Sequence, residues 1–310
     1  LSLGSRLSFR QVGYRFTTWA REAYVIVNDI DAEELKKPTL HVDMPVHADV
    51  KDLLTVMDEV LSEEGKADGA ASMTQEYKDA QAEWLRICQG WKHDYPVVLP
   101  KHMNGGTETE ANVYAFAYEM SRRLNENQIV VVGNGSANVV CGHANIVKKG
   151  QRFISNSGIA SMGYGLPASI GACVADHSQD IILITGDGSI QMNIQELATC
   201  VEYKLPVINV IINNGYLGMV RQWQEKLYHK HYSETKISGP DFVKVAEAYG
   251  ARGFRVTKEE EIIPVLQQAI ECKQPVFIDF VVDEYEMVYP WVLAGNPLNK
   301  VLLSNDCPIN

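Results

Sequence analysis

The sequence predicts an α/β protein with a doubly wound, mostly parallel sheet, preceded by part of a second α/β domain. Residues 181–185 and 206–212 are short apolar runs rich in β-branched residues, which is typical of strands buried on both faces. Residues 193–203 lie between them and carry apolar residues at helical spacing. A right-handed crossover through such a helix places the two strands parallel and close together.

The N-terminal segment, residues 1–62, contains too few elements for a complete domain. We expect a strand at 24–27, a weaker extended piece at 40–46 and an amphipathic helix at 50–61. One strand and one helix cannot enclose a hydrophobic core, so we expect this segment to be the C-terminal part of a larger α/β domain.

Residues 63–104 connect this segment to the next domain. They begin with a small, polar stretch that indicates a linker. A helix is expected at 75–93, where apolar residues recur at helical spacing. Trp84 and Trp91 share the apolar face of this helix, so we expect both to pack against the protein rather than to take part in chemistry.

We expect residues 105–290 to form the doubly wound domain and residues 291–310 to form a C-terminal arm. The other elements expected in the domain are helices at 110–124, from 166 onwards, at 242–249 and at 259–271, and strands at 128–132 and 275–282. The charged and aromatic stretch after Trp223 is expected to be a mobile lid or a surface segment.

Composition narrows the class of protein. The formal net charge of −11 argues against a nucleic-acid surface. The six cysteines show no paired spacing, which argues against a disulfide framework or a zinc site and fits the reducing cytoplasm. The sequence shows no signal peptide and no long apolar run, so we expect no membrane segment. It begins with Leu1 instead of methionine, which leaves open that it is a fragment.

Two polar turns follow the paired strands. Residues 186–189 are Gly-Asp-Gly-Ser, and residues 213–215 are Asn-Asn-Gly. Ligands of open α/β sheets bind at the carboxyl ends of strands, so we expect Asp187 and Asn214 to be neighbours. A carboxylate, an amide oxygen and a nearby backbone carbonyl form a hard oxygen site that suits Mg²⁺ and leaves positions for phosphate.

The glycines of both turns would let the backbone approach a bulky anion. Ser189 and a helix N-terminus could then donate hydrogen bonds to phosphate. Taken singly, either turn is as well explained as an ordinary strand-to-helix connection. Their pairing across one strand–helix–strand unit is more specific.

The two turns and their spacing resemble the thiamine diphosphate signature of enzymes related to pyruvate decarboxylase. The stretch NNGYLGMVRQWQ, which begins at Asn213, resembles more narrowly the catalytic subunit of acetolactate synthase. The resemblance implies the thiamine diphosphate-binding fold, with Mg²⁺ held by Asp187, the Asn214 side chain and the Tyr216 carbonyl. The cofactor-contacting residues that it implies are Gly135, Ser136, Ala160, Met162, Gly186, Asp187, Gly188, Ser189, Asn214, Tyr216, Leu217, Gly218 and Met219.

Two of these residues have particular roles in the family. A methionine that matches Met162 wedges between the two cofactor rings and enforces a bent shape. The backbone at Ala160 would face the aminopyrimidine, although the family usually has glycine there. The resemblance also implies that Met219, Val220 and Trp223 line the substrate pocket.

The activity implied by the resemblance is decarboxylation of pyruvate and addition of the two-carbon unit to a second 2-oxo acid, with the thiazolium ring as electron sink. The family activates its cofactor with a glutamate of an N-terminal pyrimidine-binding domain, which is expected ahead of Leu1. No catalytic residue is therefore assigned within this chain, and the chain alone is expected to be inactive. A complete site forms between two subunits, which implies a homodimer or tetramer and leaves a regulatory subunit open.

One departure from the family keeps another function open. Gly135-Ser136-Ala137 stands where acetolactate synthases carry glycine-glutamine-histidine. The altered loop favours a related carboligase with a different acceptor, such as a keto-sugar in polysaccharide synthesis. A third hypothesis is a cofactor-binding fragment that is inert by itself.

The resemblance extends to residues 1–62, which correspond to the second half of the middle domain of the family. In many members this domain holds FAD. Asp29 and Asp49 are then candidates for the ribose and adenine side of the flavin. Acidic residues at strand ends without any ligand explain the same pattern equally well.

Overall fold

A computed structural model describes residues 1–66, 74–103, 111–176, 178 and 181–304. The chain forms two compact units, one of residues 1–96 with 289–310 and the other of residues 97–288. The predicted boundary between residues 104 and 105, most of the polar linker and the end of the C-terminal arm lie outside the described residues. The division into four segments therefore stays a prediction.

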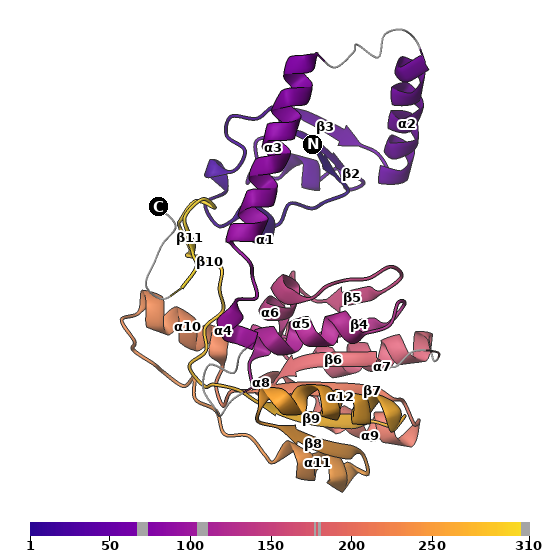
Figure 1. Ribbon diagram of the computed structural model, residues 1–310, viewed down its shortest axis with the longest axis vertical. Helices are drawn as coiled ribbons and strands as arrows, with labels where there is room; N and C mark the ends of the chain where they lie inside the picture. The colour runs from indigo at the N-terminus through magenta and orange to yellow at the C-terminus, as the bar shows by residue number, and fades with distance from the viewer. Residues whose placement is uncertain (67–73, 104–110, 177, 179–180, 305–310) are drawn as a thin grey trace. The chain divides into compact units, whose positions relative to one another are not determined.

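The second unit is built on a six-stranded sheet in which all neighbouring strands are parallel. This confirms the predicted doubly wound, parallel sheet. The spatial order is β5-β4-β6-β7-β9-β8 (Figure 1). The strands are β4 (Ile129–Val132), β5 (Arg152–Ser155), β6 (Ile181–Gly186), β7 (Val207–Asn213), β8 (Arg252–Val256) and β9 (Val276–Val281).

Helices cover both faces of this sheet (Figure 1). One face packs on α5 (Val113–Arg123), α6 (Ser136–Ala144) and α12 (Ile262–Glu271), and the other packs on α7 (Gly165–Ala175), α9 (Leu197–Glu202) and α11 (Phe242–Tyr249). Within β6, Ile182 and Ile184 belong to the first core, and Ile181 and Leu183 belong to the second. Because successive side chains point to opposite faces, a strand covered on both faces has a continuous apolar sequence.

The chain changes its direction of travel across the sheet between β4 and β6. After β4 it moves outward to β5, and it then returns to the other side of β4 to form β6. Helix α6, which follows β4, packs on one face, whereas α9, which follows β6, packs on the other. The segments leaving β4 and β6 therefore diverge, and a switch point of this kind is where open α/β sheets bind ligands.

In the described part of this unit, the sequence predicts neither the strands β5 and β8 nor the helices α4 (Pro100–Met103) and α6. Strands β5 and β8 are the sheet edges, and both contain arginine, so they lack the apolar run of the central strands. The remaining elements are α8 (Asp187–Ile190), η3 (Ile194–Glu196), α10 (Gly218–Leu227) and η4 (Glu259–Glu261).

The local conformation after β6 also differs from the prediction. The expected turn at 186–189 is largely the short helix α8, for which Gly186 is the N-cap. The expected helix at 193–203 begins with the 3-10 turn η3 before it continues as α9. Apolar periodicity marks the buried face of a segment but does not fix how tightly its first turn is wound.

The first unit contains a three-stranded parallel sheet, in the order β1-β2-β3. A small core of Leu7, Val12, Val25 and Val27 lies against it. The elements of this unit are β1 (Ser2–Leu3), α1 (Phe9–Val12), η1 (Phe16–Thr18), β2 (Ile26–Asp29), η2 (Glu34–Lys36), β3 (Met44–His47), α2 (Val50–Lys66), α3 (Gln75–Asp94), β10 (Trp291–Val292) and β11 (Val301–Leu302).

Trp84 and Trp91, which we expect to be packing residues, are more exposed than that expectation implies. The two side chains are 59% and 53% exposed, and their rings meet edge to face with centroids 5.6 Å apart. Helical periodicity located α3 but could not say what covers its apolar side, since that depends on the neighbours of the helix.

Candidate functional site

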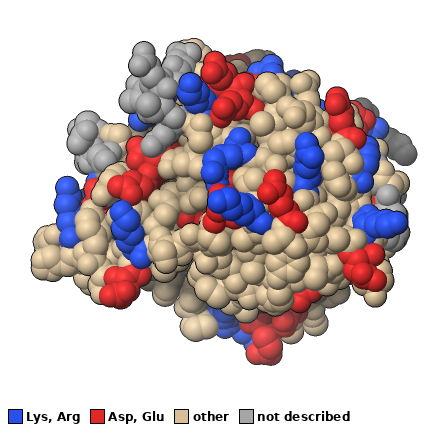
Figure 2. Space-filling model, turned by 90° about the horizontal axis from the view of Figure 1, so that it is seen from below, with Lys and Arg blue, Asp and Glu red and all other residues tan. Residues whose placement is uncertain are grey.

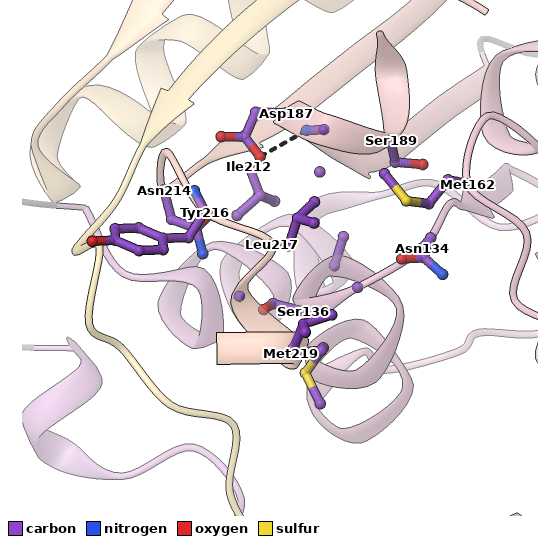
Figure 3. Close-up of a pocket in the computed structure, with 16 residues that line it drawn as sticks. Asn134, Ser136, Met162, Asp187, Ser189, Ile212, Asn214, Tyr216, Leu217 and Met219 are labelled. Atoms are coloured by element: carbon purple, nitrogen blue, oxygen red, sulfur yellow. Dashed lines mark hydrogen bonds between the residues drawn. The ribbon is translucent and has the colours of Figure 1, made fainter. Parts of the chain in front are cut away.

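A cavity lies at the carboxyl ends of β4, β6 and β7 in the second unit (Figure 3). It is lined by residues 134–137, Met162, residues 186–189, Ile212, Asn214 and residues 216–220. The structure thus brings together the residues predicted to contact the cofactor, with the exception of Ala160. It adds Asn134, Ala137 and Ile212, which sequence reasoning missed although two of them adjoin the predicted Gly135 and Ser136.

Asp187 occupies the floor of this site at the start of α8 and is 4% exposed. Its Oδ1 accepts a hydrogen bond of 2.8 Å from the backbone N–H of Gly188, and its Oδ2 accepts one of 2.8 Å from the backbone N–H of Gly215. Gly215 belongs to the turn after β7. The two predicted turns are therefore neighbours in space, as the parallel pairing of β6 with β7 requires.

Burial raises the pKa of Asp187 to about 6, because a low-dielectric surrounding disfavours the charged carboxylate. The backbone N–H groups of Gly188 and Gly215 act in the opposite direction, and the charge of Asp279 adds a smaller upward contribution. A cation beside Asp187 would favour the ionised form and lower its pKa again.

The turn after β7 is held in a fixed shape. Asn214 Oδ1 accepts a hydrogen bond of 3.1 Å from the backbone N–H of Tyr216, which forms an Asx turn. The segment around residues 235–237 also holds the turn. The backbone N–H of Leu217 donates to the Thr235 carbonyl over 2.8 Å, and the backbone N–H of Ile237 donates to the Gly215 carbonyl over 2.9 Å. The Asn214 amide and the Tyr216 backbone therefore remain beside Asp187 (Figure 3).

Helix α6 begins at the opposite wall. Gly135 is its N-cap, with a φ of 81° that favours glycine, and Ser136 is its first residue. The N–H groups of a first helical turn have no intrahelical partner and attract anions. A Cβ at Gly218 would lie 2.7 Å from Asn214 Nδ2 and 3.2 Å from Ser136 Oγ, so the glycine lets three segments meet here.

Met162 reaches the cavity from a separate loop, which two side chains fix to the region after β6. Ser189 Oγ accepts a hydrogen bond of 3.1 Å from the backbone N–H of Gly163, and Asn193 Nδ2 donates one of 2.9 Å to the Gly163 carbonyl. A Cβ at Gly188 would lie 3.0 Å from Leu217 Cδ2 and 3.1 Å from Ile237 Cδ1, so this glycine permits the close approach of those two side chains beside Met162.

Ala160 does not line the cavity, but it is tied to its wall. The side-chain amide of Asn134 donates a hydrogen bond to the Ala160 carbonyl. Ala160 has a φ of 57°, in the left-handed region that residues other than glycine seldom adopt. This backbone conformation is the physical reason for a glycine preference at the position.

Helix α10 contributes Met219 and Val220 to the cavity wall. The next two residues are 1% exposed and bind elsewhere: Arg221 pairs with Glu225 over 3.0 Å, and the Gln222 amide exchanges hydrogen bonds of 3.0 Å and 2.8 Å with the backbone of Val288. Trp223 is half-buried and is not among the residues that line the cavity. Its assignment to an acceptor pocket stays a prediction.

Asp29 and Asp49 lie in the first unit, at the carboxyl ends of β2 and β3. Each uses one carboxylate oxygen locally: Asp29 accepts a hydrogen bond of 2.9 Å from the backbone N–H of Asp31, and Asp49 accepts one of 2.8 Å from that of Lys51. These contacts explain both carboxylates as turn and helix-start residues. Their assignment to FAD stays a prediction.

Comparison with known proteins agrees with the chemistry of the cavity. Residues 129–280 match the family described as thiamine pyrophosphate enzyme, C-terminal TPP binding domain. These residues contain β4 to β9 and the segments after β4, β6 and β7 that form the cavity. They belong to this family, and the second unit is therefore built around a thiamine pyrophosphate-binding domain.

Acetolactate synthase large subunits are among the proteins to which the chain is similar. The chain is 35% identical over 298 residues to the large subunit of Pyropia yezoensis, which covers 95% of this chain and 47% of that protein. It is also 35% identical to the isozyme 3 large subunit of Escherichia coli, over 91% of this chain and 47% of that protein. An acetolactate synthase of Mycobacterium bovis is 33% identical, over 97% and 47% of the two chains.

The chain spans about half the length of the curated relatives that it matches. These identities confirm the resemblance to the acetolactate synthase catalytic subunit, and the chain corresponds to the C-terminal half of that subunit. Across the part of the chain that the structure describes, no helix has the length and apolar character needed to span a membrane.

On the face that Figure 2 shows, basic and acidic side chains of the described residues are interspersed.

Proposed function

We propose that this chain forms the diphosphate-binding half of a thiamine diphosphate-dependent carboligase of the acetolactate synthase type. The observation that carries the proposal is the buried carboxylate of Asp187, which faces the Asn214 turn at the switch point of the sheet. Such a position combines an oxygen-rich cation site with free N–H groups for an anion.

The residues present fit a magnesium ion. Asp187 is a buried carboxylate with a raised pKa, and the described residues offer no cluster of three or more histidine, cysteine, aspartate or glutamate side chains for a metal. A site of one carboxylate, the Asn214 amide oxygen and the Tyr216 carbonyl therefore leaves coordination positions for phosphate oxygens. Mg²⁺ is commonly bound through few protein ligands together with phosphates.

The other residues of the cavity would bind and orient the cofactor. The first turn of α6, with Ser136, would donate hydrogen bonds to the diphosphate. Met162, held through Gly163, would support the bent shape of the bound molecule. Met219 and Val220 would provide an apolar wall that excludes water from the reacting atoms. When bound, thiamine diphosphate supplies the electron sink for decarboxylation and carboligation.

Asp187 and Tyr216 are the titratable residues among those that line the cavity, and no glutamate is among them in the described part of the chain. The family resemblance is the ground for proposing that the activating glutamate comes from another domain or subunit of the full-length protein. We propose that the complete site forms between two subunits of a homo-oligomer in the cytoplasm, with pyruvate as the first substrate.

The acceptor and FAD remain separate proposals. The identity to acetolactate synthases favours a second 2-oxo acid as acceptor, whereas the altered Gly135-Ser136-Ala137 stretch keeps a keto-sugar under consideration. FAD in the first unit would be detected by the flavin absorption of the purified full-length protein.

Acetolactate formation tests the proposed function. The full-length protein should convert pyruvate to acetolactate when thiamine diphosphate and Mg²⁺ are present, and EDTA should stop the reaction. The 310-residue chain alone should show no turnover. Absence of cofactor binding by the full-length protein would refute the proposal, and turnover only with a keto-sugar acceptor would favour the alternative.

A further inference from the structure

A second buried carboxylate lies behind the turn that carries Asn214. Asp279 is on β9, which is the neighbour of β7 in the sheet, and it is 2% exposed. Its Oδ1 accepts a hydrogen bond of 2.8 Å from Asn213 Nδ2. Asn213 is the last residue of β7 and immediately precedes Asn214, so this hydrogen bond fixes the residue from which the turn departs.

The second oxygen of Asp279 is paired with an arginine at the edge of the sheet. Arg255 Nε donates to Asp279 Oδ2 over 2.9 Å, and its Nη2 donates to Asp241 Oδ1 over 2.7 Å. The Arg255 side chain is 44% exposed, whereas that of Asp279 is 3% exposed. The positive partner is therefore partly screened by solvent, while the negative one is enclosed in the sheet.

Asp279 does not line the cavity, and it reaches the proposed cation site through the hydrogen bond to Asn213. Its negative charge is the smallest of the causes that act on the pKa of Asp187, of which burial is the largest. Asp279 therefore acts on the proposed cation site in two ways: through the hydrogen bond to Asn213, and through its negative charge.

We propose that Asp279 is a positioning residue for the Asn213-Asn214 turn, and that Arg255 limits how strongly the negative charge of Asp279 attracts the bound cation. The inference rests on the proposed Mg²⁺ site and names two residues outside its ligand set. Groups that hold metal ligands in place typically change metal affinity by about 10–100-fold when they are lost.

The two residues have opposite effects under this proposal. Asp279→Asn removes a negative charge and places an amide N–H against either Asn213 or Arg255, so Mg²⁺ affinity should fall by about 10–100-fold. Arg255→Gln leaves the Asp279 carboxylate without its counter-charge, so Mg²⁺ affinity should rise a few-fold, and the rise should shrink at high salt.

The experiment is a Mg²⁺ titration of the full-length protein at saturating thiamine diphosphate and pH 8, where carboxylates are ordinarily ionised. Binding is measured by calorimetry, and the melting temperature is recorded in EDTA. Arg252→Gln is the matched control, because Arg252 lies exposed on the same strand and stacks 5.6 Å from the Phe254 ring. It should leave the Mg²⁺ affinity unchanged, and Arg255→Lys should restore the wild-type value.

Opposite shifts in the two variants would support the inference. Equal losses, or no change in affinity with lowered melting temperatures, would assign Asp279 and Arg255 a purely structural role and overturn it. If Asp279→Asn does not fold, the sign of the Arg255→Gln shift decides by itself, since a purely structural ion pair gives no gain in affinity. Failure of the wild-type protein to bind Mg²⁺ would refute the proposed function as well.

Discussion

The Oδ2 atom of Asp187 lies 2.8 Å from the backbone nitrogen of Gly215, 28 positions later in the sequence. The two residues meet because β6 and β7 are adjacent parallel strands whose carboxyl ends lie at the same edge of the sheet. This hydrogen bond couples the buried charge of Asp187 to the position of the Asn214 turn. A change in either partner should therefore affect cation binding before it affects the fold.

Replacing Asp187 by asparagine removes the charge but keeps an oxygen that can accept from a backbone N–H. We expect Mg²⁺-dependent thiamine diphosphate binding by the full-length protein to fall about 100-fold or more, since a unit-charge interaction at short range is worth about 4 kcal/mol. Calorimetry with and without Mg²⁺ measures this change. Asp58→Asn is the control, because Asp58 is exposed on α2, so this change should leave the affinity unchanged and alter stability by no more than about 0.5 kcal/mol. An unchanged affinity in Asp187→Asn would remove this residue from the site.

The raised pKa of Asp187 predicts how stability depends on pH. The folded-state value is about 6, whereas an unfolded aspartate has a pKa of about 3.9. Between these values the folded protein binds more protons than the unfolded chain, so the contribution of Asp187 to stability falls as the pH rises. The loss should approach about 3 kcal/mol above pH 6, since each pKa unit corresponds to about 1.4 kcal/mol.

Unfolding in EDTA between pH 4 and pH 8 measures this effect as a difference between wild type and Asp187→Asn. The difference isolates Asp187 from other shifted groups such as Glu286, whose pKa burial raises to about 7. With Mg²⁺ and thiamine diphosphate present, binding should weaken as the pH falls below 6, because protons then compete with the cation. A wild-type profile that matches that of the variant would contradict the assignment.

Gly218 should be needed for binding rather than for folding. A Cβ at this position would lie 2.7 Å from Asn214 Nδ2 and 3.2 Å from Ser136 Oγ, so Gly218→Ala should displace the Asn214 amide. We expect Mg²⁺ affinity to fall about tenfold or more, as in other cases where the support of a metal ligand is disturbed. The melting temperature should stay nearly constant, because alanine favours the helix.

Gly142→Ala is the matched control for Gly218→Ala. Gly142 lies on α6, and a Cβ there would meet no atom within 4 Å. This variant should gain about 0.5–1 kcal/mol of stability from helix propensity and bind Mg²⁺ as the wild type does. Equal affinities of the two glycine variants would show that the close approach at Gly218 does not matter for the site.

Substitution of Trp223 distinguishes a structural role of this residue from a functional one. If it shapes the acceptor pocket, Trp223→Leu should spare folding and change the product ratio when two 2-oxo acids compete, by about 1–3 kcal/mol of discrimination. If it only packs, the same change should lower stability by about 1–3 kcal/mol and leave the ratio as it was. Competition assays and thermal unfolding of the full-length protein distinguish the two outcomes.

Local features of the sequence predict the central strands of the sheet and the position of the two polar turns. The apolar runs at 181–185 and 206–212 predict the central strands β6 and β7, because strands buried on both faces cannot contain polar residues without partners. The polar turns that follow them are placed by the same argument at one edge of a parallel sheet. The amino-acid sequence alone therefore predicts that Asp187 and Asn214 are neighbours.

Only the tertiary structure decided how that site is supported. Asn134 lines the cavity and binds the Ala160 carbonyl, 26 positions later, and Asp279 binds the Asn213 side chain, 66 positions earlier. The helical and strand periodicities of a sequence relate only neighbouring positions, so they could not predict either contact. The edge strands β5 and β8 were missed for a related reason. How much of an edge strand is buried depends on the elements that pack against it, and its own sequence need not be apolar. The exposed Trp84 and Trp91 show the same limit: a sequence marks an apolar face, but only the assembled chain shows what covers it.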